Sequence, residues 1–157
     1  MKTDDKDRIL KIFKNLDVSN VPFNVNPSNI SEVGLDIAEN LNDILKALND
    51  NISLKWCLST VKKAKVFSIV YQCNEKKMSI YKEEIAKKLP EYSYKTIATI
   101  VDEGIAKGFY VSLDPYDAKI SDKKIKNIRP SLEVITAFYK WNFHRISATY
   151  KIINKFK

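Results

Sequence analysis

The sequence has few of the residues that interrupt regular structure or build covalent and metal frameworks. Its 157 residues include 3 Gly, 5 Pro, 2 Cys and 1 His. The scarcity of Gly and Pro excludes collagen-like and low-complexity architectures, while 45% hydrophobic and 11% aromatic content excludes a disordered chain. Cys57, Cys73 and His144 are too few for a disulfide framework or a zinc site. We therefore expect a globular protein with two buried free thiols, no metal and no cofactor.

Long apolar runs are also missing. No stretch approaches the roughly 20 consecutive apolar residues that a membrane-spanning helix needs. The N-terminal residues MKTDDKDRIL are acidic, whereas a signal peptide starts with a basic segment followed by an apolar one. We therefore expect a cytoplasmic protein with no membrane partner.

Positive charge is unevenly distributed along the chain. The net charge is +8, and 24 of the 27 basic residues are Lys, a bias that AT-rich coding also produces. Residues 1–75 contain ten basic and ten acidic side chains, whereas residues 76–157 contain 17 basic and nine acidic ones. A coding bias would spread lysine evenly, so the asymmetry indicates a polyanionic partner for the second half.

Hydrophobic periodicity and turn residues predict a mainly helical chain with one short hairpin. An α+β, mainly α fold is therefore predicted. In chain order, the predicted helices cover residues 5–17, 28–50, 54–74, 78–89, 93–108 and 132–156, and the predicted strands cover 109–113 and 124–128.

Capping residues support several of these boundaries. Ser79, Ser93 and Ser131 each precede a predicted helix and can act as its N-cap. Gly108 stands where a left-handed residue ends a helix, directly before the β-favouring residues of the first strand. Gly104 lies inside a predicted helix, where glycine costs about 1 kcal/mol relative to Ala, so we expect close packing or a bend there.

Two short helices joined by a tight turn and followed by a hairpin are typical of a winged helix-turn-helix. Ile97, Ile100 and Val101 recur at helical spacing and are expected to face inward, leaving polar residues outward in the first half of the second helix. The candidate DNA-binding residues are Ser93, Tyr94, Lys95, Thr96, Thr99, Lys119, Lys123, Lys124, Lys126 and Arg129. Lys95 suits a base or a phosphate equally, and Arg129 alternatively pairs with a carboxylate of the fold.

The segments EEIAKKL, SYKTIATIVDEGIAKGF and DKKIKNIRPS resemble the first motif helix, the recognition helix and the wing of MarR-like transcriptional regulators. The resemblance extends over about residues 54–141. That family usually has Arg two residues after the wing Asp, whereas this chain has Lys124 after Asp122, and lysine is the poorer bidentate donor. The resemblance implies a homodimer in which N- and C-terminal helices intertwine and two winged helices bind a pseudo-palindromic site.

The long flanking helices favour such a homodimer independently of the resemblance. The first has a heptad-like apolar seam, and the last carries more apolar surface than one neighbour can bury. We therefore divide the chain into an arm and dimerisation helix (1–53), a winged-helix domain (54–130) and a C-terminal dimerisation helix (131–157), together one compact unit. The candidate interface residues are Ile37, Leu41, Ile44, Leu48, Trp141, Ile146, Tyr150 and Ile153. The alternative is that these side chains complete a monomeric core.

The sequence thus predicts a nucleoid-associated DNA-binding transcriptional regulator, with double-stranded DNA as its partner. A protein-interaction scaffold without DNA binding and a non-specific architectural DNA-binding protein are the alternatives. No phosphate loop, nucleophile elbow or catalytic carboxylate pair is recognisable, so we do not expect an enzyme. The resemblance allows for a small-molecule effector, but the sequence does not identify one.

Overall fold

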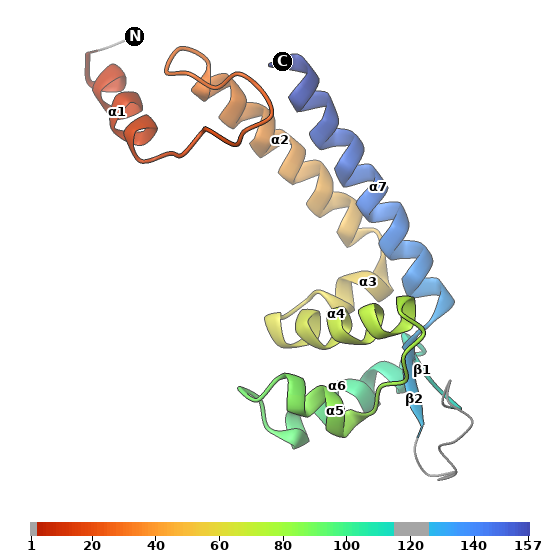
Figure 1. Cartoon of the computed structure of the whole chain (residues 1–157). Coiled ribbons are helices and arrows are strands. Elements are labelled where there is room, and N and C mark those ends of the chain that lie inside the picture. The colour runs from red at the N-terminus through yellow and green to blue at the C-terminus, as the bar shows by residue number, and fades with distance from the viewer. Residues whose placement is uncertain (1–2, 115–125) are drawn as a thin grey trace. The chain divides into compact units, whose positions relative to one another are not determined.

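The computed structural model describes residues 3–114 and 126–157, and it is mainly helical (Figure 1). One two-stranded antiparallel sheet accompanies the helices in the described residues, which confirms the α+β, mainly α class. The elements are α1 Thr3–Lys14, α2 Ile30–Asn49, α3 Ile52–Cys57, α4 Val61–Glu75, α5 Lys82–Lys88, α6 Tyr94–Ala106, β1 Tyr110–Leu113, β2 Asn127–Pro130 and α7 Leu132–Lys155.

The chain forms two compact units. Unit 1 comprises Met1–Ala47 and Trp141–Lys157, and unit 2 comprises Leu48–Lys140. The divisions lie inside α2 and α7, whereas the sequence placed its boundaries at 53/54 and 130/131.

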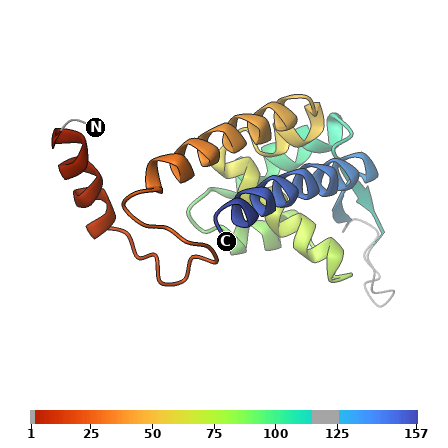
Figure 2. The same ribbon diagram turned by 90° about the horizontal axis from the view of Figure 1, so that it is seen from above.

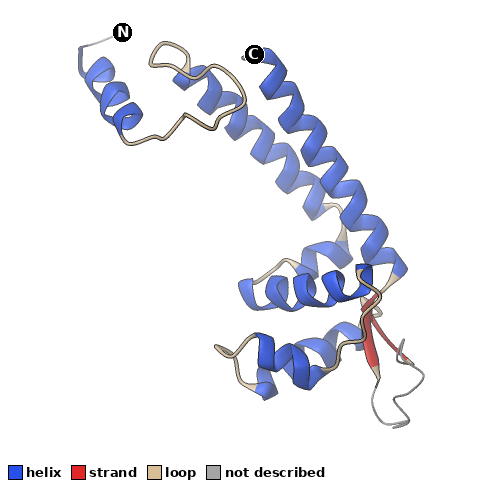
Figure 3. Ribbon diagram, viewed as in Figure 1, coloured by secondary structure: helices blue, strands red, loops and turns tan. Residues whose placement is uncertain are grey.

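Unit 2 has an apolar core to which each of its helices contributes. Leu54 of α3, Ile85 of α5 and Val134 of α7 are fully enclosed, as are residues of α4 and α6. The two short strands lie beside these helices (Figure 3). Burying each such side chain contributes about 1.5–3 kcal/mol, so this core can hold the unit together.

The single core helix predicted over 54–74 is wrong, because the chain forms α3 and α4 with a break between them. Asn51 caps α3 by accepting a hydrogen bond from Leu54 N at 2.9 Å. Thr60 caps α4 by accepting one from Lys63 N at 3.2 Å. The hydroxyl of Ser59 donates to Trp56 O, so polar side chains satisfy the backbone at the break.

The start predicted for α5 is also wrong. Ser79 was the predicted cap, but α5 begins at Lys82, and Tyr81 at the cap position makes no capping hydrogen bond. The preceding residue, Ile80, is held beside β2: its N–H donates to Asn127 Oδ1, and its carbonyl accepts from Ile128 N, both at 2.9 Å. These bonds keep the segment extended, so the helix starts later.

The hairpin pairs Tyr110 with Pro130 and Leu113 with Asn127. The second strand, predicted at 124–128, begins at Asn127 in the described residues and continues to Pro130. Pro130 ends the ladder, where its missing N–H is tolerated. Ser131 then accepts a hydrogen bond from Val134 N at 3.3 Å, which confirms it as the cap of α7.

Helix α6 forms as predicted and packs very closely against β1. Ser93 caps it by accepting from Thr96 N, and Gly108 has a left-handed φ of 75° just beyond its end. At Gly104, a Cβ atom would lie 2.2 Å from Cδ2 of Tyr110 and 3.2 Å from Cη2 of Trp56. Close packing is therefore the reason for this mid-helix glycine.

Unit 1 is built on α2 and α7, which run side by side in opposite directions (Figure 2). Trp141 Nε1 donates to Ile44 O at 3.0 Å near one end of the pair. Near the other end, Lys155 Nζ lies 2.8 Å from Asp36 Oδ2 and 2.9 Å from Glu32 Oε1. No helix among residues 3–114 and 126–157 has the length and apolar character to cross a membrane.

Replacing Gly104 with Ala should lower the free energy of unfolding by about 2–3 kcal/mol, because the buried Tyr110 ring has no room to move aside. Chemical denaturation measures this change. Gly34→Ala is the matched control, since Gly34 is also helical but a Cβ atom added there would meet nothing within 4 Å, and it should not destabilise the protein. Equal stabilities for both variants would contradict the close packing.

Candidate nucleic-acid interface

The first half of α6 presents most of the predicted recognition residues to solvent. Ser93, Tyr94, Lys95 and Thr99 are exposed and Thr96 is half-buried. The opposite face of the helix buries Ile97, Ile100, Val101 and Gly104, so the inward prediction for the three apolar residues is confirmed. The core thereby fixes which side of α6 points outward.

Two carboxylates on the outer side of α6 are paired with lysines from neighbouring helices. Asp102 forms an ion pair with Lys82 of α5. Glu103 accepts a hydrogen bond from Trp56 Nε1 at 3.0 Å and lies 3.9 Å from Lys63 Nζ of α4. These contacts reduce the repulsion that two free carboxylates would exert on a polyanion.

A basic hollow lies on one side of α6, between this helix and the first turn of α4. We call it the α4–α6 hollow; its volume is about 380 Å³. Its lining combines lysines and threonines from the two helices with one apolar residue at the base. The lining residues are Thr60, Lys62, Lys63, Lys95, Thr96, Thr99 and Ile100.

A second hollow, of about 450 Å³, lies on the other side of α6. Its wall includes Tyr94, Asp102 and residues of α5 and the hairpin. The Tyr94 hydroxyl donates to Glu83 Oε1 at 3.3 Å, and Asp102 pairs with Lys82. Two pairs of polar side chains in this hollow, Tyr94 with Glu83 and Lys82 with Asp102, therefore engage each other. The predicted recognition residues are divided, with Tyr94 here and Lys95, Thr96 and Thr99 in the α4–α6 hollow.

The described part of the hairpin carries less free positive charge than the sequence suggested. Lys126 Nζ lies 2.6 Å from Asp114 Oδ1, and this lysine holds the pKa of the Asp114 carboxyl below its usual value. Arg129 is half-buried in β2 opposite Val111. The remaining predicted wing residues, Lys119, Lys123 and Lys124, lie outside the described residues.

The candidate dimer residues of α2 and α7 differ in their exposure within the single chain. Four of them are exposed, namely Ile37 (51%), Leu41 (52%), Ile146 (60%) and Tyr150 (59%). The other four are half-buried, namely Ile44, Leu48, Trp141 and Ile153. Within unit 1, Ile44 and Trp141 meet through the indole hydrogen bond, so they contribute to packing inside the chain.

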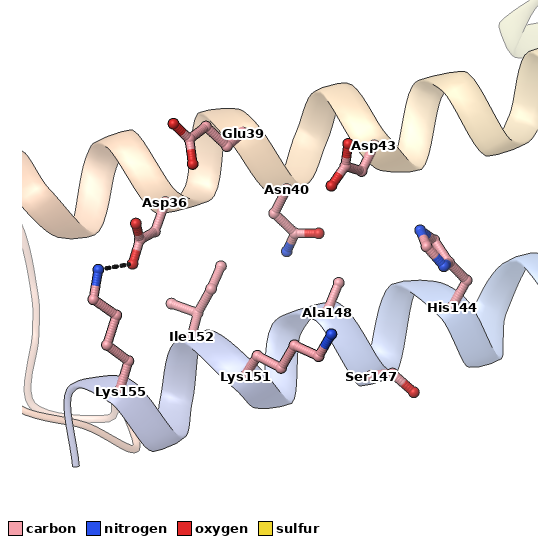
Figure 4. A pocket seen from close by; sticks show the side chains of 10 residues that line it. All are labelled: Asp36, Glu39, Asn40, Asp43, His144, Ser147, Ala148, Lys151, Ile152 and Lys155. Carbon is pink, nitrogen blue, oxygen red and sulfur yellow. Dashed lines mark hydrogen bonds and ion pairs between the residues drawn. The ribbon is translucent and has the colours of Figure 1, made fainter.

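The groove between α2 and α7 is lined by acidic and basic residues (Figure 4). Asp36, Glu39 and Asp43 project from α2, while His144 and Lys151 project from α7. The Lys155–Asp36 ion pair closes one end. The groove is therefore a charged helix seam with an ion pair at one end, and His144 lines it as an exposed residue.

Both cysteines lie in environments that disfavour the thiolate form. Burial raises the pKa of the Cys57 thiol to about 12, and burial also raises the pKa of Cys73. Cys57 is fully buried and Cys73 half-buried, and both are free thiols. In the part of the chain that the structure describes, no three His, Cys, Asp or Glu side chains come together as a metal site.

Sequence reasoning missed Thr60, Lys62, Lys63 and Lys82 as contributors to this region. The first three belong to the α4–α6 hollow, and Lys82 pairs with a carboxylate of α6. The Ser-Thr pair at 59–60, directly before the apolar Val61, is the local signal that could have placed a helix start there.

Comparison with known proteins gives no match: no protein-family model, no curated protein and no solved structure is significantly similar to this chain.

The thiol environments predict slow alkylation of the folded protein. A thiolate is the reactive form, so a raised pKa lowers the reaction rate at a given pH. At about pH 8, maleimide should modify Cys73 before Cys57, and Cys57 should react only when denaturant unfolds the protein. Mass spectrometry of digested samples measures both sites. Fast labelling of Cys57 in the native protein would contradict its burial.

Proposed function

We propose that the protein is a DNA-binding transcriptional regulator that acts as a homodimer. In this proposal α5, α6 and the β1–β2 hairpin of unit 2 form a winged helix-turn-helix, with α6 as the recognition helix. The observation that carries the proposal is the outer face of α6, where exposed hydroxyl and lysine side chains precede carboxylates already paired with lysines.

The arrangement of unit 2 supports this assignment. Helix α5 packs on α6 after a short connection, and α6 packs on β1, which pairs with β2. In winged helices this order places the second helix in the major groove and the hairpin against the backbone or the minor groove. Ser93, Tyr94 and Thr99 would then place hydroxyl groups against base edges, with the Tyr94 and Thr99 oxygens as acceptors, and Lys95 would supply a positive charge.

The surface of unit 1 supports the homodimer. Among the described residues of this unit, only Val33 and Phe156 are buried apolar side chains. Ten large apolar residues are at least 46% exposed: Leu10, Ile12, Leu16, Leu35, Ile37, Leu41, Leu45, Phe143, Ile146 and Tyr150. A helix pair with so much exposed apolar surface needs a further partner, and a second copy offers a self-complementary surface.

A homodimer explains how weak individual contacts can select a site. Two copies related by a two-fold axis would place two α6 helices in successive major grooves, roughly 34–36 Å apart. Lysine contacts to phosphates would supply affinity without sequence preference, while α6 would read bases. A pseudo-palindromic duplex is therefore the proposed ligand.

The proposal is tested by binding to a labelled duplex from the region upstream of the protein's own gene, and to a scrambled duplex of equal length. Affinity is measured between about 50 and 200 mM salt. A sequence-specific regulator should prefer one duplex by about a thousandfold or more, and both affinities should fall steeply with salt. Other upstream regions are screened by the same criterion if the first shows no preference.

The other outcomes point to the alternative functions. Equal affinity for every duplex, with a steep salt dependence, would replace the regulator with a non-specific architectural protein. No binding by folded protein would contradict DNA binding and favour an interaction scaffold.

The dimer is tested by Leu41→Asp and Ile146→Asp. Because both side chains are exposed in the single chain, the substitutions should leave its own packing intact while placing carboxylates in the apolar interface. We expect the mass measured by light scattering to fall to that of the 18.1 kDa monomer, or the dissociation constant to rise at least a hundredfold.

Ile52→Asp is the matched control, because Ile52 is a 78% exposed apolar residue of unit 2. It should leave the oligomeric mass unchanged. Unchanged dimers in the Leu41 and Ile146 variants would show that this face is not the interface, and monomeric wild type at all concentrations would contradict the homodimer.

A further inference from the structure

We infer that the α4–α6 hollow binds the phosphate backbone of duplex DNA, with Lys62 of α4 and Lys95 of α6 as its two anchoring residues. This inference rests on the proposed function and extends the interface to α4, a helix that lies outside the proposed helix-turn-helix. It also assigns Lys95 to phosphate, where the sequence alone left base and phosphate contacts equally open.

The composition of the hollow fits phosphate oxygens. Three lysines and three threonines line it, and none of its lining residues is acidic. Lysine ammonium groups and hydroxyls both donate hydrogen bonds to phosphate. The second hollow beside α6 differs in this respect, because Glu83 and Asp102 contribute to its wall.

The lysines of the hollow have different roles. Lys63 is partly buried, with its Nζ 4.3 Å from the centre of the Trp56 ring and 3.9 Å from Glu103 Oε1. It is therefore held as part of the wall and neutralises a carboxylate. Lys62 and Lys95 are exposed, and neither has an ion-pair partner among residues 3–114 and 126–157. No carboxylate in this part of the chain offsets the charge of these two lysines, so both can attract an anionic ligand.

Hydrogen bonds to the backbone orient two of the hydroxyls. Thr60 accepts from Lys63 N as the cap of α4, and Thr99 donates to Lys95 O at 2.8 Å. Their positions are thereby fixed at opposite walls of the hollow. The proton of Thr60 is left for a phosphate oxygen, whereas Thr99 has already donated its proton and acts as a wall of the site. The first turn of α4 contains no acidic residue, so no carboxylate there offsets the charge of Lys62.

The openness of the site favours a polymer backbone over a small free anion. The two anchoring lysines, Thr60 and Thr99 are all exposed, so the lining would leave a free phosphate largely hydrated. A duplex backbone instead spans the hollow and continues onto the exposed face of α6, where Ser93 and Thr99 lie. Each contact between a lysine and a phosphate releases counterions, so several weak contacts along one strand add up to a substantial affinity.

The experiment compares Lys62→Gln and Lys95→Gln with the wild type on one duplex that the wild type binds. Each variant should bind about tenfold more weakly near 0.1 M salt, and the slope of log affinity against log salt should become shallower by about 1. Any preference between specific and scrambled duplex should persist in Lys62→Gln, because phosphate contacts carry no base information.

Neutral methylphosphonate groups placed one at a time along the duplex locate the contact. At the phosphate bound by the hollow, the substitution should weaken the wild type but have little further effect on the Lys62→Gln or Lys95→Gln variant. Such non-additivity identifies a direct contact and not a general loss of charge.

Lys76→Gln is the matched control, since it removes the same charge at the opposite end of α4, about 21 Å away along the helix. It should keep the wild-type slope. Wild-type slopes in the Lys62 and Lys95 variants, together with additive methylphosphonate effects, would show that the hollow does not bind the phosphate backbone, while leaving DNA binding in place. Wild-type protein that binds no duplex would overturn both proposals.

Discussion

Tyr110 lies directly against the backbone of α6 at Gly104, and the candidate interface depends on this contact. The Trp56 ring packs edge-on to Tyr110 at 6.1 Å and donates its N–H to Glu103. Trp56 also carries the ammonium group of Lys63 over its ring. One small residue on α6 thus allows β1, α3 and α4 to be fixed around the same helix. The position of the α4–α6 hollow follows from this packing.

The positive charge that is free to attract a polyanion is smaller than the composition suggests. Lys82, Lys63 and Lys126 are each paired with a carboxylate, so they act mainly by neutralising acidic groups near the proposed interface. Surface pairs of this kind contribute little to stability, because water screens them. Their effect is to reduce the negative electrostatic potential that an approaching polyanion would meet. Lys62 and Lys95 attract a polyanion more strongly, because no carboxylate among the described residues is paired with them.

Local signals in the sequence identified several helix ends that are determined locally. Ser93, Gly108 and Ser131 mark helix ends through hydrogen bonds or dihedral angles within a few residues, and each was predicted. The start of α5 was predicted wrongly because a distant residue decides it. Asn127 holds Ile80 in an extended conformation across 47 positions, so Ser79 does not start a helix. The break before α4 has a local cap in Thr60, but it was missed because apolar periodicity continues across residues 58–60. The pairing of lysines from two helices around one hollow is a tertiary property and has no local signal.

The sparse packing of unit 1 has a consequence for how the protein responds to its own abundance. If a second copy covers the exposed apolar faces of α2 and α7, association contributes to the stability of the folded chain, and mass action links that stability to concentration. Dilution would then loosen the helix pair before the better packed core around Leu54 and Val134. Copy number in the cell would then set the fraction of chains whose α2 and α7 faces are covered, so the proposed regulator would respond to its own concentration.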